Sequence, residues 1–145
     1  MTKDTKIIGN ITEIEVMLYI TKLGHQVSIP YGDRARYDQI WDINGKLIKV
    51  QVKTSHKDDE NTISINCHTT NRAESKTKNR RYTKDEIDCI ATCYEGKCYL
   101  IHINEVPSRC IKLRFNKTNN FQNQGVHYAS DYEVEKQLKK IQEHR

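Results

Sequence analysis

The sequence contains no long run of apolar residues. Across 145 residues, no stretch approaches the roughly 20 consecutive apolar side chains that a membrane-spanning helix needs. The N-terminal segment, MTKDTKIIGN, also lacks the apolar core of a secretory signal. We therefore expect no membrane partner and an intracellular, cytoplasmic location.

Internal repeats and signals of a domain boundary are absent as well. A chain of 145 residues is long enough for one domain with a hydrophobic core and too short for two comfortable ones. The sequence therefore predicts a single domain over residues 1–145.

Disulfide bonds are not expected, although the chain contains five cysteines. An odd number of cysteines in an intracellular protein favours free thiols. The spacing of Cys89, Cys93 and Cys98, with His102 after them, raises a zinc site as an alternative. That spacing does not match paired zinc ligands, and Cys89 and Cys93 fall within one expected strand. Buried free thiols are therefore the preferred interpretation.

An extreme charge imbalance is also missing. Lys and Arg number 24 and Asp and Glu number 19, which leaves a formal net charge of +5. An excess of this size favours an anionic partner but does not establish one, because many soluble proteins carry as much.

The sequence does contain both helical and strand patterns. Residues 10–23 predict a helix with an apolar stripe of Ile11, Ile14 and Leu18, and its wide apolar surface suggests packing across a sheet. A second helix is expected over 131–144, with Asp131 as its cap. A polar turn is expected over 56–61. Short strands are expected over residues 25–30, 62–67, 87–94, 97–103 and 110–115.

Two further strands form the centre of the prediction. They cover residues 37–43 and 46–54, and the Asn44-Gly45 dipeptide between them is the one most favoured for a tight hairpin turn. Trp41 is expected in the core and Asp42 in the turn. Strand alternation separates an apolar face from a polar one. The first face carries Ile48, Val50, Val52 and Thr54, and the second carries Lys49, Gln51, Lys53 and Ser55.

This hairpin carries residues suited to phosphodiester hydrolysis. The reaction needs positive charge, usually from a divalent cation with oxygen ligands, and a water that a nearby lysine can orient. Asp38 offers a carboxylate and Gln51 offers an amide oxygen. Val52 offers its backbone carbonyl, and Lys53 shares a face with Gln51. An acid, oxygen ligands and a lysine can thus converge on one phosphate.

The order Tyr37-Asp38 and then Gln51-Val52-Lys53 resembles the PD-(D/E)XK nuclease superfamily, with glutamine in place of the second motif's acid. Neighbouring segments narrow the resemblance to the group I intron-encoded homing endonucleases of that superfamily. These segments are GNITE at 9–13, LGHQVSIPYGD at 23–33, NGKLIKVQVKTS at 44–55, RRYTKDEID at 80–88, YLIHINEVPSR at 99–109 and IKLRF at 111–115. The resemblance covers most of the chain up to about Phe115.

The resemblance implies an α/β fold with a restriction-endonuclease-like core, in which a central mixed β-sheet is flanked by helices. It also implies an Mg²⁺-dependent site and cleavage of double-stranded DNA at a long target. A homo-oligomer, either dimer or tetramer, follows because cutting both strands requires two active sites. The basic segment 68–84 and the helix over 131–144 would be elaborations of the core.

Roles for individual residues follow from the same resemblance. Asp38 matches the principal metal ligand, Lys53 the motif lysine, and Glu13 a helix glutamate that many members add to the site. Gln51 stands where an acid is usual, and the intron-encoded group is itself known for this glutamine. The implied catalytic residues are therefore Glu13, Asp38, Gln51 and Lys53, and the implied metal ligands are Asp38, Gln51, Val52 and Glu13.

Purely structural roles remain open for two of these residues. Glu13 follows Asn10 by three positions, so the two could form a capping box, and Glu15 is a competing candidate for the site. Asp38 alone could be a strand-end acid that pairs with Arg34 or Arg36.

Several basic and amide residues are candidates for DNA contact. Arg34 and Arg36 lie beside the predicted site, and Ser55 follows the motif lysine on the same face. Segment 68–84 is almost without apolar residues and predicts a mobile basic loop, either a solvated linker or a phosphate-binding element. Its candidate contacts are Lys76, Lys78, Arg80 and Arg81. The amide-rich segment 116–124 could read adenine edges or be disordered.

The sequence therefore predicts an Mg²⁺-dependent, site-specific DNA endonuclease of the homing type. A Holliday-junction resolvase or a restriction-type nuclease of the same superfamily is the nearest alternative. A DNA-binding protein on a nuclease scaffold that no longer cuts is the alternative from another class, with Gln51 as its signature.

Overall fold

The computed structural model describes residues 3–73, 76–117 and 125–143. The fold is a mixed α/β fold around a central five-stranded sheet, with strand order β1-β2-β3-β8-β9. Strands β3 and β8 run parallel, and the other neighbours run antiparallel. The predicted mixed sheet is thus confirmed. Its strands are β1 (Gln26–Ser28), β2 (Gln39–Ile43), β3 (Lys46–Val52), β8 (Cys89–Tyr94) and β9 (Lys97–His102).

Two tight hairpins build this sheet, as predicted. At each turn both central residues adopt positive φ angles, which suits a two-residue turn matched to the twist of its strands. Asn44 and Gly45 have φ of 54° and 92°, and Glu95 and Gly96 have φ of 49° and 81°. The Asp42 carboxylate accepts a hydrogen bond from Gly45 N at 2.7 Å, which confirms its expected place in the turn.

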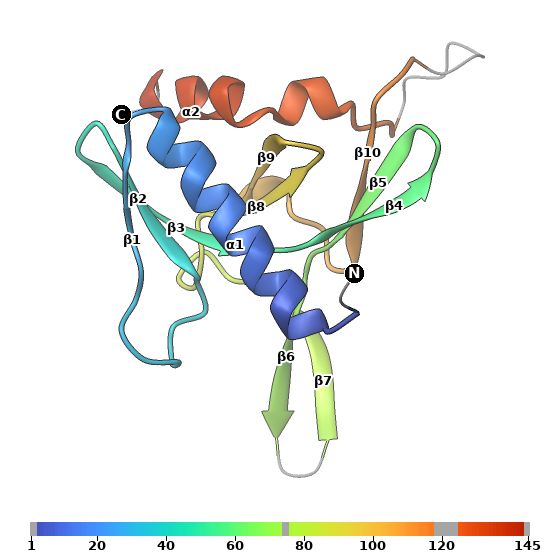
Figure 1. The fold of residues 1–145 in the computed structure, drawn as a ribbon. Coiled ribbons are helices and arrows are strands. Elements are labelled where there is room, and N and C mark those ends of the chain that lie inside the picture. The colour runs from blue at the N-terminus through green and yellow to red at the C-terminus, as the bar shows by residue number, and fades with distance from the viewer. Residues whose placement is uncertain (1–2, 74–75, 118–124, 144–145) are drawn as a thin grey trace.

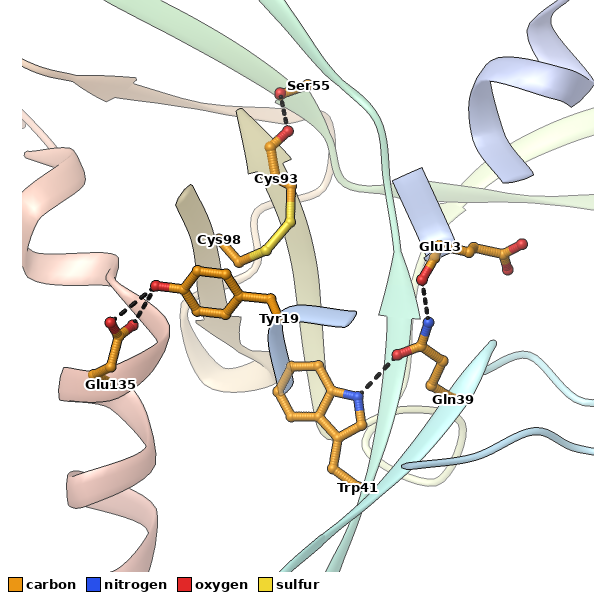
Figure 2. The surroundings of a disulfide bond; sticks show 8 residues. All are labelled: Glu13, Tyr19, Gln39, Trp41, Ser55, Cys93, Cys98 and Glu135. Carbon is orange, nitrogen blue, oxygen red and sulfur yellow. Dashed lines mark hydrogen bonds between the residues drawn. A yellow bond between two sulfur atoms is a disulfide. The ribbon is translucent and has the colours of Figure 1, made fainter. Parts of the chain in front are cut away.

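Both helices cover the same face of the central sheet (Figure 1). They are α1 (Thr5–Lys22) and α2 (Val134–Glu143). The Tyr19 hydroxyl joins them by donating to both carboxylate oxygens of Glu135, each at 2.9 Å (Figure 2). The core beneath them is made of Val16, Ile20, Trp41, Val50, Val134 and Leu138, among others.

A smaller sheet covers the opposite face. It has the strand order β10-β5-β4, with β4 (Ser55–Asp59), β5 (Thr62–Asn66) and β10 (Cys110–Arg114). Ile63 and Ile65 of β5 pack into a second core with Ile90 of the central sheet. The predicted polar turn over 56–61 is therefore wrong in part, because its first residues pair with β5 as strand β4.

The predicted mobile loop at 68–84 is wrong. The chain there forms a hairpin of β6 (His68–Ala73) and β7 (Lys76–Arg81), which projects from the body (Figure 1). Contacts at its base hold it, since Thr69 is buried and Arg81 donates to the Val106 carbonyl at 2.6 Å. The composition suggested a loop because the segment has no apolar face. Its strands are instead held by backbone hydrogen bonds and by the contacts at the base of the hairpin.

Helix α1 differs from the prediction in its start and its buried face. It begins at Thr5, and the Asp4 carboxylate caps it by accepting from Lys6 N at 2.9 Å. Asn10 lies inside the helix, so the capping box with Glu13 is excluded. The core-facing residues are Thr12, Val16 and Ile20, whereas the predicted stripe of Ile11, Ile14 and Leu18 is exposed.

The C-terminal helix is shorter than the predicted 131–144. A 3₁₀ turn (Ala129–Tyr132) precedes it, and Asp131 lies in that turn and does not cap α2. Instead, the Asp131 carbonyl accepts a hydrogen bond from the side chain of Gln137 at 2.7 Å. Residue 144 lies outside the described residues. No helix in the described part of the chain is long and apolar enough to cross a membrane.

Two of the predicted free thiols form a disulfide. Cys93 and Cys98 lie directly opposite each other in the β8–β9 hairpin and are joined (Figure 2). Cys67 and Cys89 are buried free thiols, as expected, and Cys110 is exposed. Counting cysteines could not reveal this pair, because its formation depends on which residues the hairpin register places side by side.

Candidate active site

Asp38 directly precedes strand β2 and lies beside the last residues of strand β3. Its amide donates to the Val50 carbonyl at 2.8 Å, and its carboxylate accepts from Val52 N at 2.9 Å. Both contacts fix the side chain beside the Gln51-Val52-Lys53 segment. The tight turn at Asn44-Gly45 makes this possible, because it sets the register that brings residue 38 to residues 50–52.

Glu13 lies on α1, in the helical turn closest to Asp38. The Gln39 side chain donates to the Glu13 carbonyl at 2.8 Å, and Trp41 Nε1 donates to Gln39 Oε1 at 3.0 Å (Figure 2). One residue earlier, the Thr12 hydroxyl lies 3.0 Å from the Thr54 hydroxyl. Hydrogen bonds at Thr12 and at the Glu13 carbonyl thus join the helix to the two chain segments that carry the motif.

The Glu13 and Asp38 carboxyl groups affect each other's protonation. The pKa of Glu13 is raised to about 7. Burial is the largest cause, and the charge of Asp38 and a hydrogen bond shared with it contribute the rest. Burial also raises the pKa of Asp38. The hydrogen bonds with the Val52 amide and Glu13, and the charge of Lys53, lower this pKa and offset part of the rise. The two carboxyl groups therefore form a close, hydrogen-bonded pair.

Lys53 lies close enough to lower the pKa of Asp38. Its ammonium group donates to the His68 carbonyl at 3.1 Å and lies 5.4 Å from the centre of the Tyr82 ring. Gln51 is half-buried on β3, between Val50 and Val52, the two residues that bond Asp38. The structure thus brings Glu13, Asp38 and Lys53 together, and Gln51 lies on β3 two residues before Lys53.

Oxygen donors dominate this site. A cavity of about 320 Å³ opens beside Glu13 and Asp38, with Ile14, Met17 and Ile29 on its apolar side. Carboxylate, amide and carbonyl oxygens are the ligands that hard divalent cations prefer, and the closely spaced carboxylates suit such a charge. The described residues contain no group of three or more His, Cys, Asp and Glu side chains suited to a metal. Glu13 and Asp38 are the acids that line this cavity.

Gln39 is a site residue that the sequence analysis missed. It is almost fully buried, at 1% exposed, yet polar, and it bonds both Trp41 and the Glu13 carbonyl. A glutamine two residues before an expected core tryptophan was the available signal, because a buried amide must find partners. Thr12 and Thr54 were also missed, because their hydrogen bond joins residues that are distant in the sequence.

Replacing Gln39 tests how firmly α1 is held. We expect Gln39→Leu to lower the free energy of unfolding by about 2 kcal/mol, because the buried Trp41 indole and Glu13 carbonyl lose their partner. Urea denaturation of both proteins measures the loss. Gln26→Leu, at an exposed position on the same sheet, is the control and should change stability by less than about 0.5 kcal/mol. Equal effects of the two substitutions would refute the positioning role.

Comparison with known proteins places this arrangement in a family. A family model described as PD-(D/E)XK endonuclease matches residues 3–135. The chain belongs to the PD-(D/E)XK endonuclease family. The solved structure of the bacterial homing endonuclease I-Ssp6803I is similar in fold, with a TM-score of 0.73 and 23% identity over 97% of this chain and 98% of that one. No curated protein matches the chain.

Several basic residues of this PD-(D/E)XK endonuclease are engaged within the protein. Arg80 donates two hydrogen bonds to the Glu86 carboxylate, at 2.6 and 2.7 Å, and Arg36 forms an ion pair with the same carboxylate at 3.5 Å. These hydrogen bonds from Arg80 lower the pKa of Glu86 to about 2. Arg36 also donates to Thr69 at 3.4 Å, so one cluster ties the loop before β2 to the β6–β7 hairpin.

The remaining candidates for DNA contact differ in their surroundings. Arg34 is exposed in the loop before Asp38. Ser55 donates to the Cys93 carbonyl at 3.1 Å, which holds the start of β4 against β8. The side chains of Lys76 and Lys78, and segment 118–124 of the amide-rich stretch, lie outside the described residues.

Proposed function

We propose that the protein is a metal-dependent, site-specific DNA endonuclease of the homing type. The observation that carries this proposal is the pair of Glu13 and Asp38 carboxyl groups, which lie close enough to share a hydrogen bond, beside the Lys53 ammonium. Nothing in the fold requires two acids to lie so close, whereas a cation site does. The fold likeness to a homing endonuclease supports this choice within the family.

The cofactor in this proposal is Mg²⁺. Members of the family generally use divalent metal ions. Asp38 and Glu13 would hold the ion, together with the Val52 carbonyl and the Gln51 side-chain oxygen. When bound, it would neutralise negative charge on the phosphate that is attacked.

The chain's own residues supply the remaining requirements. Lys53 provides a cation that can orient the attacking water or stabilise the phosphate oxygens. The Tyr82 ring and the His68 carbonyl hold its side chain in place. Gln51 contributes an uncharged oxygen, so the metal would receive less negative charge than a second-motif acid provides. Glu13 makes up part of this difference in the proposal.

DNA contact is proposed for the loop before the site and for the projecting hairpin. Arg34 is the best placed of these residues, because it is exposed and lies four positions before Asp38. Arg36 and Arg80 pair with the same Glu86 carboxylate, Ser55 begins β4, and β7 carries Lys76, Lys78, Arg80 and Arg81. We propose one nuclease domain, in which the β6–β7 hairpin and the C-terminal helix are elaborations, acting on DNA inside the cell.

A homo-oligomer is part of the proposal, and α1 offers its interface. Ile7, Ile11, Ile14 and Leu18 recur at spacings of four, three and four, as the seam of a coiled coil does, and each is 45–57% exposed. A second copy can bury the same stripe by two-fold symmetry, which would also supply the second active site.

Charges placed in that stripe should separate the subunits. We expect Ile11→Asp combined with Leu18→Asp to convert an oligomer to a monomer, since each buried carboxylate would lack a partner. Light scattering coupled to gel filtration gives the mass. Glu15→Lys, an exposed charge change on the same helix, should leave the mass unchanged. A wild-type chain that is monomeric at micromolar concentration would contradict this assignment.

The choice of DNA substrate separates the alternatives. A randomised duplex library and a four-way junction are each incubated with the protein and Mg²⁺. Double-strand cuts at one long sequence are the expected result. Cuts confined to the junction would favour a resolvase, and binding without any cut would favour the inactive scaffold.

A further inference from the structure

The outer face of the β10-β5-β4 sheet is polar. Strand alternation buries Ile63 and Ile65 of β5, so Ser64 and Asn66 point to the other side. His56 of β4 lies directly opposite Ser64, and Cys110 of β10 lies directly opposite Asn66. One face of this sheet therefore forms part of the core, and the other presents hydrogen-bonding side chains.

This polar face forms the floor of a cavity of about 690 Å³. The base of the β6–β7 hairpin and the turn before β10 close its sides. No Asp or Glu is among its lining residues. Most lining residues carry a polar or basic group, and with two arginines and no acid among them the groove fits an anionic partner.

Arg109 is the available cation in this groove. It is exposed, and among the described residues no hydrogen bond or ion pair involves its guanidinium group. By contrast, Arg80 in the same groove is bonded to Glu86, and Lys112 on the neighbouring strand is paired with Asp58 at 3.1 Å. The guanidinium group of Arg109 is thus available to bind an anionic ligand.

The groove adjoins the candidate active site. His68 lines it, and the carbonyl of that residue accepts the hydrogen bond from Lys53 Nζ at 3.1 Å. The Asn66 side chain fixes this corner, since its Oδ1 accepts from His68 N at 3.0 Å. A polyanion held in the groove would therefore pass close to the Lys53 ammonium group.

We propose that this groove binds the sugar-phosphate backbone of duplex DNA that flanks the cleaved phosphate. Arg109 would bind a phosphate, and His56 and Asn66 would supply hydrogen bonds to the backbone. The proposal rests on the function proposed above and adds the outer face of the β10-β5-β4 sheet to the hairpin and the loop before β2 as a contact surface.

The exposed thiol at the edge of the groove gives a direct test. Cys110 lines the cavity, while the other four cysteines are buried or bonded to each other. With duplex DNA at about ten times its dissociation constant and no divalent metal, we expect alkylation of Cys110 to slow about tenfold, because only free protein reacts. A Cys110→Ser, Lys139→Cys variant, with its thiol on α2, should react at an unchanged rate. An unchanged rate at Cys110 in saturated protein would overturn the proposal.

Arg109→Gln gives a second readout. We expect weaker duplex binding, with the slope of log affinity against log salt reduced by about 0.9, the value of one lost phosphate contact. Lys139→Gln on α2 is the matched control. Equal slopes in the two variants would also overturn the proposal. Because binding is measured without metal, protein that binds through the groove but never cuts would refute the proposed nuclease activity alone. A chain that binds no duplex would refute both.

Discussion

Asp38→Asn is expected to reduce DNA cleavage by about a thousandfold or more. The substitution removes the carboxylate charge that would hold the cation, and several kcal/mol of charge stabilisation corresponds to roughly that factor. The asparagine oxygen can still accept the hydrogen bond from Val52 N, which the wild-type carboxylate accepts at 2.9 Å. The fold should therefore survive, and single-turnover cleavage with Mg²⁺ measures the loss.

Asp42→Asn is the matched control for that experiment. Asp42 lies on β2, which begins directly after Asp38, and its carboxylate serves the turn by accepting from Gly45 N. We expect this variant to cleave within about twofold of wild type, since surface changes away from the chemistry have small effects. Asp38→Asn protein that unfolds normally in urea and still cleaves at the wild-type rate would disprove the assignment of Asp38.

Glu13→Gln is expected to stabilise the metal-free protein while weakening cleavage. The pKa of Glu13 is about 7 in the folded chain against an ordinary value of 4.5. Between those pH values the folded state binds more protons than the unfolded state, so this group lowers stability as pH rises through that window. Glutamine removes the charge and with it the penalty.

The comparison is made by urea denaturation in chelator at pH 8 and pH 4. At pH 8 we expect the variant to be more stable by on the order of 1 kcal/mol, after allowing for solvent screening of a half-exposed group. At pH 4 the two proteins should be equally stable, because Glu13 is protonated in both states. Cleavage by the variant with Mg²⁺ should fall about tenfold to a hundredfold. A stability gain that is the same at both pH values would contradict the raised pKa of Glu13.

Local sequence rules were sufficient for the hairpin that carries the motif. The preference of Asn44-Gly45 for positive φ fixes the turn, and the turn fixes the register that brings Asp38 to Val50 and Val52. Trp41 is fully buried and Asp42 serves the turn, both as predicted. Glu13 also lies close to Asp38, and its role in the site stays a prediction.

Features that depend on distant contacts were predicted less well. Helix α1 is apolar on several sides, so its periodicity could not reveal that Val16 faces the sheet while Ile14 faces outward. The β6–β7 hairpin has little apolar content, and its order depends on anchors such as the Arg80–Glu86 pair. The Cys93–Cys98 bond and the Gln39 hydrogen bonds likewise require knowing which residues the fold places side by side.

The most direct test of the central claim is whether the purified wild-type chain cuts DNA only when a divalent metal is present. A plasmid library with randomised inserts is incubated with the protein in Mg²⁺ and, in parallel, in chelator, and the broken ends are sequenced. We expect double-strand breaks at one recurring sequence in Mg²⁺ and none in chelator. Protein that binds the library yet leaves every plasmid intact in Mg²⁺ would contradict the central claim.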